Sequence, residues 1–219
     1  MNIDNYKSGF VAIIGRPNVG KSTFLNKVVG KKVAIMSDKP QTTRNRILGI
    51  VTTDQMQIAF TDTPGIHKPA SELQRRMVSA SYDSVKGVDC VIFMTTPVKK
   101  VLPGDQIILD NLKNTKIPVF LVINKVDQLA KFNDIDLTIA LYKDLYPFAG
   151  VFPISVIENK NVDILLSTIQ SYLPFGPKMY PDDMISDHPQ RFLVSELIRE
   201  KILYLTSQEV PHSIAVVID

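Results

Sequence analysis

Eight residues near the N-terminus have the types and spacing of a phosphate-binding loop. Residues 15–22 read GRPNVGKS, which matches G-x-x-x-x-G-K-[ST] and lies between an expected strand and an expected helix. The glycines of such a loop let backbone N–H groups surround phosphate oxygens, and the helix N-terminus favours negative charge. We expect Lys21 to reach the β- and γ-phosphates and the Ser22 hydroxyl to bind Mg²⁺. The predicted nucleotide contacts in this segment are Gly15, Arg16, Pro17, Asn18, Val19, Gly20, Lys21, Ser22 and Thr23.

Two further segments supply the oxygen ligands that Mg²⁺ prefers. DTPG at residues 62–65 follows an apolar strand, so Asp62 is expected to hold Mg²⁺ through water and the Gly65 N–H to meet the γ-phosphate. Thr63 and Pro64 complete this predicted contact segment. QTTR at residues 41–44 offers a hydroxyl that completes the Mg²⁺ shell when a γ-phosphate is present, with Thr43 favoured and Thr42 the alternative. The alternative for QTTR is a solvated basic loop.

The segment NKVD at residues 124–127 resembles the guanine-specifying motif of GTPases. The Asp127 carboxylate can accept hydrogen bonds from N1–H and the 2-amino group of guanine. Adenine offers neither donor, so we expect a buried Asp127 to discriminate strongly between the bases. The stem of Lys125 can cover the base, and Asn124 can tie this loop to the phosphate-binding loop.

Apolar runs alternate with helical patterns as far as residue 173. This alternation predicts an α/β fold with a doubly wound, mostly parallel six-stranded sheet and one antiparallel edge strand. Strands are expected at residues 10–15, 47–53, 55–60, 88–96, 117–124 and 150–155, and helices at 21–30, 105–114, 134–146 and 162–173.

The chain changes character after residue 173. Residues 174–190 are rich in proline and read as a linker, whereas 191–206 have apolar residues at helical spacing. EVPHSIAVVID at the end predicts a turn followed by a strand. We therefore expect a domain over residues 1–173 and an incomplete second domain over 191–219, because one helix and one strand bury too little surface to fold alone.

Composition excludes several classes of protein. Of 219 residues, 45% are hydrophobic and 21% charged, which excludes a disordered chain. The longest apolar runs are too short to span a bilayer, and the N-terminus lacks the apolar core of a secretory signal. One cysteine, Cys90, suits a reducing compartment. We expect a cytoplasmic protein.

The ordered motifs GRPNVGKS, QTTR, DTPG and NKVD resemble the TRAFAC class of P-loop GTPases and, more closely, the Era family of ribosome-assembly GTPases. The resemblance continues through LPFGPKMYP and RFLVSELIREKILYLT, which are similar to the Era linker and the start of its KH-type RNA-binding domain. It implies slow, Mg²⁺-dependent hydrolysis of GTP to GDP, a monomer, and a role in assembly of the small (30S) ribosomal subunit with its rRNA. Peripheral contact with the inner face of the membrane is a second implication.

This sequence departs from the family pattern at two places, and from Ras-type GTPases at a third. Ser155–Val156 stands where Era-like proteins carry Ser-Ala against guanine O6, although a backbone N–H is retained. No G-x-x-G follows the linker, so we expect contact with RNA to be weakened or lost. Ile66 stands where Ras-type GTPases have a water-orienting glutamine, so intrinsic hydrolysis should be slow.

The expected catalytic residues are Lys21, Thr43, Gly65 and Asn18. Asn18 is the candidate ligand of a K⁺ ion that supplies positive charge, with a turn-stabilising asparagine as the alternative. Arg16, Arg44 and Arg46 are the arginines close enough in sequence to be considered for the same task. Residues 31–46 and 66–80 are the expected switches. Two other functions stay open: a nucleotide-gated binding module with negligible turnover, and a TRAFAC GTPase of the tRNA-modification type.

Overall fold

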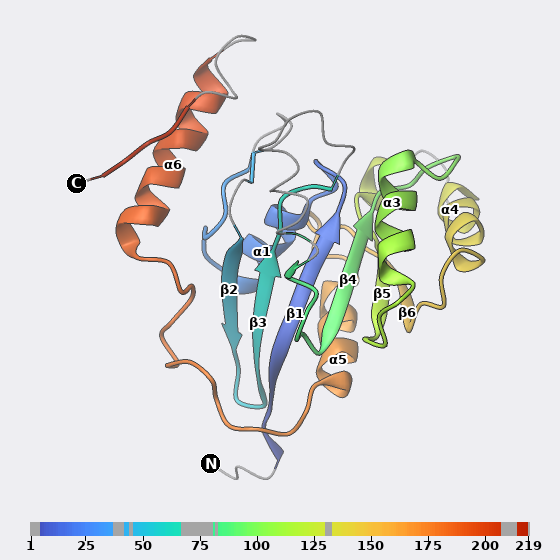
Figure 1. The fold of residues 1–219 in the computed structure, drawn as a ribbon, viewed down its shortest axis with the longest axis horizontal. Helices are drawn as coiled ribbons and strands as arrows, with labels where there is room; N and C mark the ends of the chain where they lie inside the picture. Colours follow the sequence, from blue (N-terminus) through green and yellow to red (C-terminus); the bar gives the residue numbers. More distant parts are fainter. Residues whose placement is uncertain are drawn as a thin grey trace.

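The computed structural model describes residues 5–36, 42–43, 46–66, 81, 83–129, 133–206 and 214–218. Six strands form one sheet in the order β2-β3-β1-β4-β5-β6 (Figure 1). Their bounds are β1 (Lys7–Gly15), β2 (Ile47–Thr52), β3 (Met56–Asp62), β4 (Cys90–Thr95), β5 (Val119–Ile123) and β6 (Gly150–Pro153). Neighbouring strands are parallel except β2 and β3, which are antiparallel. The predicted fold class is confirmed.

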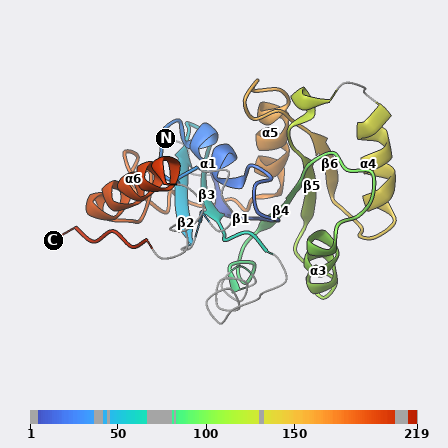
Figure 2. The same cartoon turned by 90° about the horizontal axis from the view of Figure 1, so that it is seen from above.

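Helices cover both faces of the sheet, as the continuous apolar strands require. In Figure 2, α1 (Lys21–Val29) and α5 (Val162–Tyr172) lie on one face, and α3 (Pro103–Leu112) lies on the other. Side chains of α4 (Asn133–Lys143) join the core on the same side as α3. None of the helices in the described ranges is long and apolar enough to cross a membrane.

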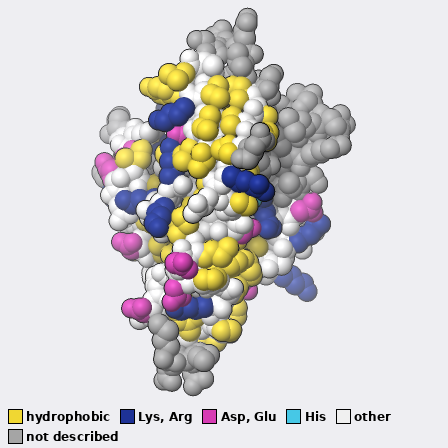
Figure 3. Space-filling model, turned by 90° about the vertical axis from the view of Figure 1, so that its left-hand side faces the viewer, with side chains coloured by type: hydrophobic (Ala, Val, Ile, Leu, Met, Phe, Trp, Pro, Cys, Tyr) yellow, Lys and Arg dark blue, Asp and Glu magenta, His cyan; other side chains and the backbone are white. Residues whose placement is uncertain are grey.

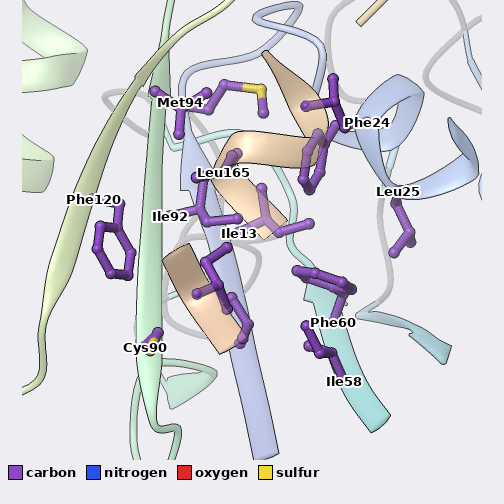
Figure 4. Packing of buried hydrophobic residues seen from close by; sticks show 14 of the residues in the cluster. Ile13, Phe24, Leu25, Ile58, Phe60, Cys90, Ile92, Met94, Phe120 and Leu165 are labelled. Atoms are coloured by element: carbon purple, nitrogen blue, oxygen red, sulfur yellow. The ribbon is translucent and has the colours of Figure 1, made fainter. Parts of the chain in front are cut away.

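The larger core explains how α1 is held over the sheet. Phe24 and Leu25 of α1 are fully buried against strand residues such as Phe60, with the rings of Phe24 and Phe60 edge to face at 5.8 Å (Figure 4). Leu165 of α5 completes this layer. Because α1 begins directly after the glycine-rich loop, this packing fixes the position of the loop at the end of β1.

The segment predicted as a linker lies against the sheet. Gln57 of β3 is fully buried, and its amide oxygen accepts hydrogen bonds from the backbone N–H groups of Met179 and Tyr180 at 2.7 and 2.9 Å. The N–H of Ile50, on the edge strand β2, donates to the carbonyl of Ile185 at 2.9 Å. Residues 174–190 therefore follow one path across β3 and β2 before α6 (Gln190–Leu205) begins.

Helix α6 lies beside the edge strand β2 (Figures 1 and 2). Several of its apolar side chains are exposed, and the face of the molecule that carries it shows hydrophobic patches with both basic and acidic side chains around them (Figure 3). The exposed apolar residues of α6 are Val194, Leu197, Ile198, Tyr204 and Leu205.

The strand predicted near the C-terminus is wrong for the residues that can be checked. Residues 214–218 have no strand conformation, and 207–213 lie outside the described residues. A strand needs a neighbouring strand for its backbone hydrogen bonds, and no described strand lies beside this segment. The predicted helix 191–206 corresponds to α6.

The position of Cys90 gives a test of the core. Cys90 is fully buried in β4, and burial, with a smaller contribution from Asp89, raises the pKa of its thiol to about 12. The thiolate is the reactive form, so the native protein should not react with Ellman's reagent at pH 8. Full reactivity of one thiol should appear only in guanidinium chloride. Rapid reaction of the native protein would contradict this packing.

Candidate nucleotide-binding site

The predicted phosphate-binding loop connects the end of β1 to the start of α1. Asn18 and Gly20 adopt left-handed backbone conformations, with φ of 62° and 104°, and α1 begins at Lys21. A Cβ atom at Gly20 would collide with the side-chain amide of Asn124. Glycine is therefore needed at position 20 for two reasons: its backbone conformation and its contact with the next loop.

Lys21 is buried beneath this loop. Its ammonium donates to the carbonyls of Gly15 and Arg16 at 3.1 and 2.9 Å. Burial lowers the pKa of Lys21 to about 8, although the nearby Asp62 carboxylate opposes this shift. A phosphate would offer this ammonium an ionised acceptor, which makes a stronger hydrogen bond than a carbonyl.

The three predicted Mg²⁺ ligands meet at one corner. The Ser22 hydroxyl donates to Asp62 Oδ2 at 2.6 Å and lies 3.1 Å from the Thr43 hydroxyl. Asp62 is fully buried at the end of β3, and its Oδ1 has no hydrogen-bond partner within the described part of the chain. Burial raises the pKa of Asp62 despite the opposing charge of Lys21. Two hydroxyls and a buried carboxylate with an unpaired oxygen fit Mg²⁺, either directly or through water.

The segment after Asp62 is fixed against the phosphate-binding loop. The Thr63 hydroxyl donates to the Ile13 carbonyl at 2.9 Å, and the Ile66 N–H donates to the Gly15 carbonyl at 3.1 Å. A Cβ atom at Gly65 would lie 2.6 Å from the Pro17 nitrogen, so a side chain there would displace one of the two loops. The side chain of Ile66 is fully buried in the core beside α3 and has no polar atom.

Asn124 joins the phosphate-binding loop to the loop after β6. Its amide donates to the Val19 carbonyl at 2.9 Å, and its amide oxygen accepts from the Val156 N–H at 3.2 Å. The buried Ser155 hydroxyl accepts from the Glu158 N–H, which holds this second loop in shape. Lys125 adopts a left-handed backbone with φ of 68°.

Asp127 differs from expectation in one respect. We expected a buried carboxylate, but its side chain is exposed because it lies in the short helical turn Val126–Gln128 beyond the end of β5. The Asp127 carboxylate can therefore discriminate between bases through burial only when the bound base itself covers it.

A cavity of about 540 Å³ lies over these elements. The predicted residues that line it are Pro17, Asn18, Gly20, Lys21, Ser22, Thr23, Thr43, Gly65 and Lys125. Val156 lines an adjoining hollow that shares Thr23. Four residues of α6, which sequence reasoning did not include, also line the cavity: Glu200, Lys201, Leu203 and Tyr204. Residues 37–41, 44–45 and 67–80, which hold much of the two predicted switches, lie outside the described residues.

The side chain of Arg16 is held beside α3 by an ion pair that the motif did not predict. Its guanidinium donates to the fully buried Asp105 at 2.8 Å. The same carboxylate oxygen accepts from the Tyr142 hydroxyl at 2.6 Å. Burial, with the Asp105 charge, raises the pKa of Tyr142, so this hydroxyl stays protonated as the donor. Arg16 thus anchors the phosphate-binding loop to α3 and α4, and its backbone remains the group available to phosphate.

Comparison with known proteins identifies the class of site. Residues 10–125 match a family model described as a 50S ribosome-binding GTPase. The chain is similar to the structure of Era in complex with MgGDPNP and nucleotides 1506–1542 of 16S ribosomal RNA, at 41% identity and a TM-score of 0.89 over 95% of this chain and 70% of that one. The chain belongs to the Era family of GTPases.

A second Era structure, that of a variant of the Aquifex aeolicus protein bound to GDP·AlF₄⁻, gives 41% identity and a TM-score of 0.88 over 94% of this chain and 70% of that one. The FeoB G-domain from Methanococcus jannaschii shares the fold at 22% identity and a TM-score of 0.54, over 76% of this chain and 97% of that one. Membership of the Era family makes this protein an enzyme that hydrolyses GTP. The individual roles of the site residues stay predictions.

The ion pair beneath the loop gives a test of its anchoring. Asp105→Ala leaves the guanidinium of Arg16 and the hydroxyl of Tyr142 without their shared acceptor. Breaking such a buried pair should lower the free energy of unfolding by about 3 kcal/mol, measured by urea denaturation. Asp110→Ala, an exposed carboxylate on the same helix, is the matched control and should not change the midpoint. Equal midpoints for the two variants would show that the pair does not anchor the loop.

Proposed function

We propose that this Era-family GTPase is a molecular switch in assembly of the small (30S) ribosomal subunit, and that its bound nucleotide sets its affinity for ribosomal RNA. The observation that carries the proposal is the similarity to an RNA-bound relative along 95% of the chain at 41% identity. That extent includes the segment beyond the GTPase domain. A cytoplasmic site of action follows from this partner.

The two matches differ in the ribosomal component they mention. The description of the family model mentions the 50S subunit, but the model covers only residues 10–125. The more extensive match carries a fragment of 16S RNA, the RNA of the small subunit. We therefore favour the small subunit and treat binding to the large subunit as an outcome of the test.

The geometry supports a switch that responds to the γ-phosphate. Thr43 lies within the first predicted switch and Gly65 directly precedes the second, and both line the same cavity as Lys21. A γ-phosphate would be held by the Gly65 N–H and the Lys21 ammonium, while Ser22, Asp62 and Thr43 would hold Mg²⁺. Bound Mg²⁺ neutralises charge on the phosphates. Loss of the γ-phosphate removes the group that the segments containing Thr43 and Gly65 would both contact, directly or through Mg²⁺.

Hydrolysis should be slow in the isolated protein. Ile66 has no polar atom and is buried in the core. Arg16 is held by Asp105. Asn18, which lines the cavity, stays our candidate for a K⁺ ligand.

Sedimentation with purified ribosomal subunits tests the proposal. The full chain, loaded with GDPNP or GDP, is centrifuged with 30S and, separately, 50S particles. We expect retention on 30S that is at least several-fold greater with GDPNP than with GDP, because only GDPNP carries a γ-phosphate. Equal retention with both nucleotides, or retention on 50S alone, would contradict the proposed partner.

Asp127→Asn supplies the matched control. Asparagine presents an amide where guanine needs a carboxylate, so the variant should lose GDPNP but accept the corresponding xanthosine nucleotide. Retention on 30S should then follow the xanthosine analogue. Retention that still follows GDPNP would mean that the base is not read by Asp127.

A further inference from the structure

Helix α6 and the turn before it contact the backbone at three positions within the first predicted switch, residues 31–46. Arg199 Nη2 donates to the Thr42 carbonyl at 2.7 Å, and Glu200 Oε2 accepts from the Met36 N–H at 3.0 Å. His188 Nε2 lies 3.0 Å from the Arg46 carbonyl, where β2 is about to begin. All three contacts involve main-chain atoms, so they depend on the path of the switch backbone rather than on its side chains.

Arg199 is built into this contact. Its side chain is only 4% exposed, and two of its nitrogens donate to the Glu196 carboxylate at 2.8 and 2.6 Å. A buried guanidinium is tolerated only when its charge is compensated. Glu196 supplies that compensation and also fixes the plane of the guanidinium, so that Nη2 faces the Thr42 carbonyl. The hydrogen bond to Thr42 is therefore preorganised by the helix itself.

Glu200, the next residue, connects the helix to an earlier part of the same switch. Besides the Met36 N–H, its carboxylate pairs with the ammonium of Lys32. The Glu200 side chain is 12% exposed but that of Lys32 is 38% exposed, so this pair is only partly shielded from water. Together, Arg199 and Glu200 fix the backbone at residues 36 and 42.

The contact at Thr42 is one residue from the predicted Mg²⁺ corner. Fixing the Thr42 carbonyl restricts the next residue, Thr43, whose hydroxyl lies 3.1 Å from that of Ser22. We propose that Arg199 is a positioning residue, which acts through the Thr42 backbone to hold the Thr43 hydroxyl where Mg²⁺·GTP needs it. The inference rests on the Mg²⁺ role of Thr43 and goes beyond the proposed function, because it makes retention of GTP depend on the C-terminal helix.

Coupling of this kind is reciprocal. If α6 stabilises the switch conformation that holds Mg²⁺·GTP, then Mg²⁺·GTP stabilises the docked position of α6. A partner that binds α6 in a different position should therefore weaken the binding of Mg²⁺·GTP. Mg²⁺·GTP should weaken the binding of that partner by the same factor. The exposed apolar side chains of α6 offer such a partner a surface, and the same helix is hydrogen-bonded to the first predicted switch.

Dissociation of fluorescent nucleotides from the full chain tests this inference. Arg199→Ala should release a fluorescent GDPNP analogue about tenfold faster in Mg²⁺, because Thr43 is no longer held. The rate in EDTA and the release of fluorescent GDP should not change. Arg191→Ala, an exposed arginine on the first turn of the same helix, is the matched control and should release all ligands at the wild-type rates. Circular dichroism checks that α6 is retained.

A second substitution separates positioning from general destabilisation. On a Thr43→Ala background, Arg199→Ala should add nothing, because the hydroxyl that it positions is already absent. Arg199→Lys should restore part of the retention, since one donor remains but the paired contact with Glu196 is lost. The inference is overturned if Arg199→Ala accelerates release equally on both backgrounds or in EDTA. It is also overturned if Thr43→Ala alone leaves release in Mg²⁺ unchanged, which would disprove the Mg²⁺ role of Thr43 without touching the assignment of the partner.

Discussion

The burial of one carboxylate, that of Asp62, is the constraint on which the site depends. A carboxylate at a buried strand end costs free energy unless cations or donors compensate it. The Ser22 hydroxyl donates to Oδ2 and the charge of Lys21 stabilises the carboxylate as a whole, while Oδ1 has no hydrogen-bond partner in the described part of the chain. The folded protein thus holds a polar group that is fully satisfied only when a cation arrives. The corner is therefore prepared for a metal ion that enters together with the nucleotide phosphates.

The sheet converts this local arrangement into a complete pocket. Parallel strands end at one edge, so Gly15, Asp62 and Asn124 come together although they are far apart in sequence. Asn124 then joins two loops, and Asp105 holds the side of the phosphate-binding loop that faces α3. The pocket is therefore supported from below by fixed elements and bounded above by segments that include α6. A switch requires a nucleotide site of constant geometry together with neighbouring segments that change conformation with the nucleotide.

Much of this arrangement could be predicted because the relevant signals are local. Continuous apolar runs indicate buried parallel strands, and the motifs at the strand ends contain the glycines that their loop conformations need. Contacts between distant residues left no local signal: Arg199 and Thr42 are 157 positions apart, and Arg16 and Asp105 are 89 apart. A proline-rich segment gave no indication that the buried Gln57 would hold its backbone. The C-terminal strand was predicted from the local residue pattern, whereas a strand also needs a neighbouring strand.

Thermal unfolding of Asp62→Asn, with and without a GTP analogue and Mg²⁺, tests the central claim most directly. Asparagine keeps the acceptor for Ser22 and removes the buried charge. Without ligand, the variant should therefore unfold at a temperature close to that of the wild type, because removal of the buried Asp62 charge offsets the loss of the opposite charge near Lys21. With saturating ligand, the unfolding temperature of the wild type should rise, because the ligand binds only the folded state. The unfolding temperature of the variant should rise little or not at all. A variant that is less stable without ligand, yet gains as much as the wild type with it, would show that Asp62 is a structural residue rather than part of the Mg²⁺·GTP site.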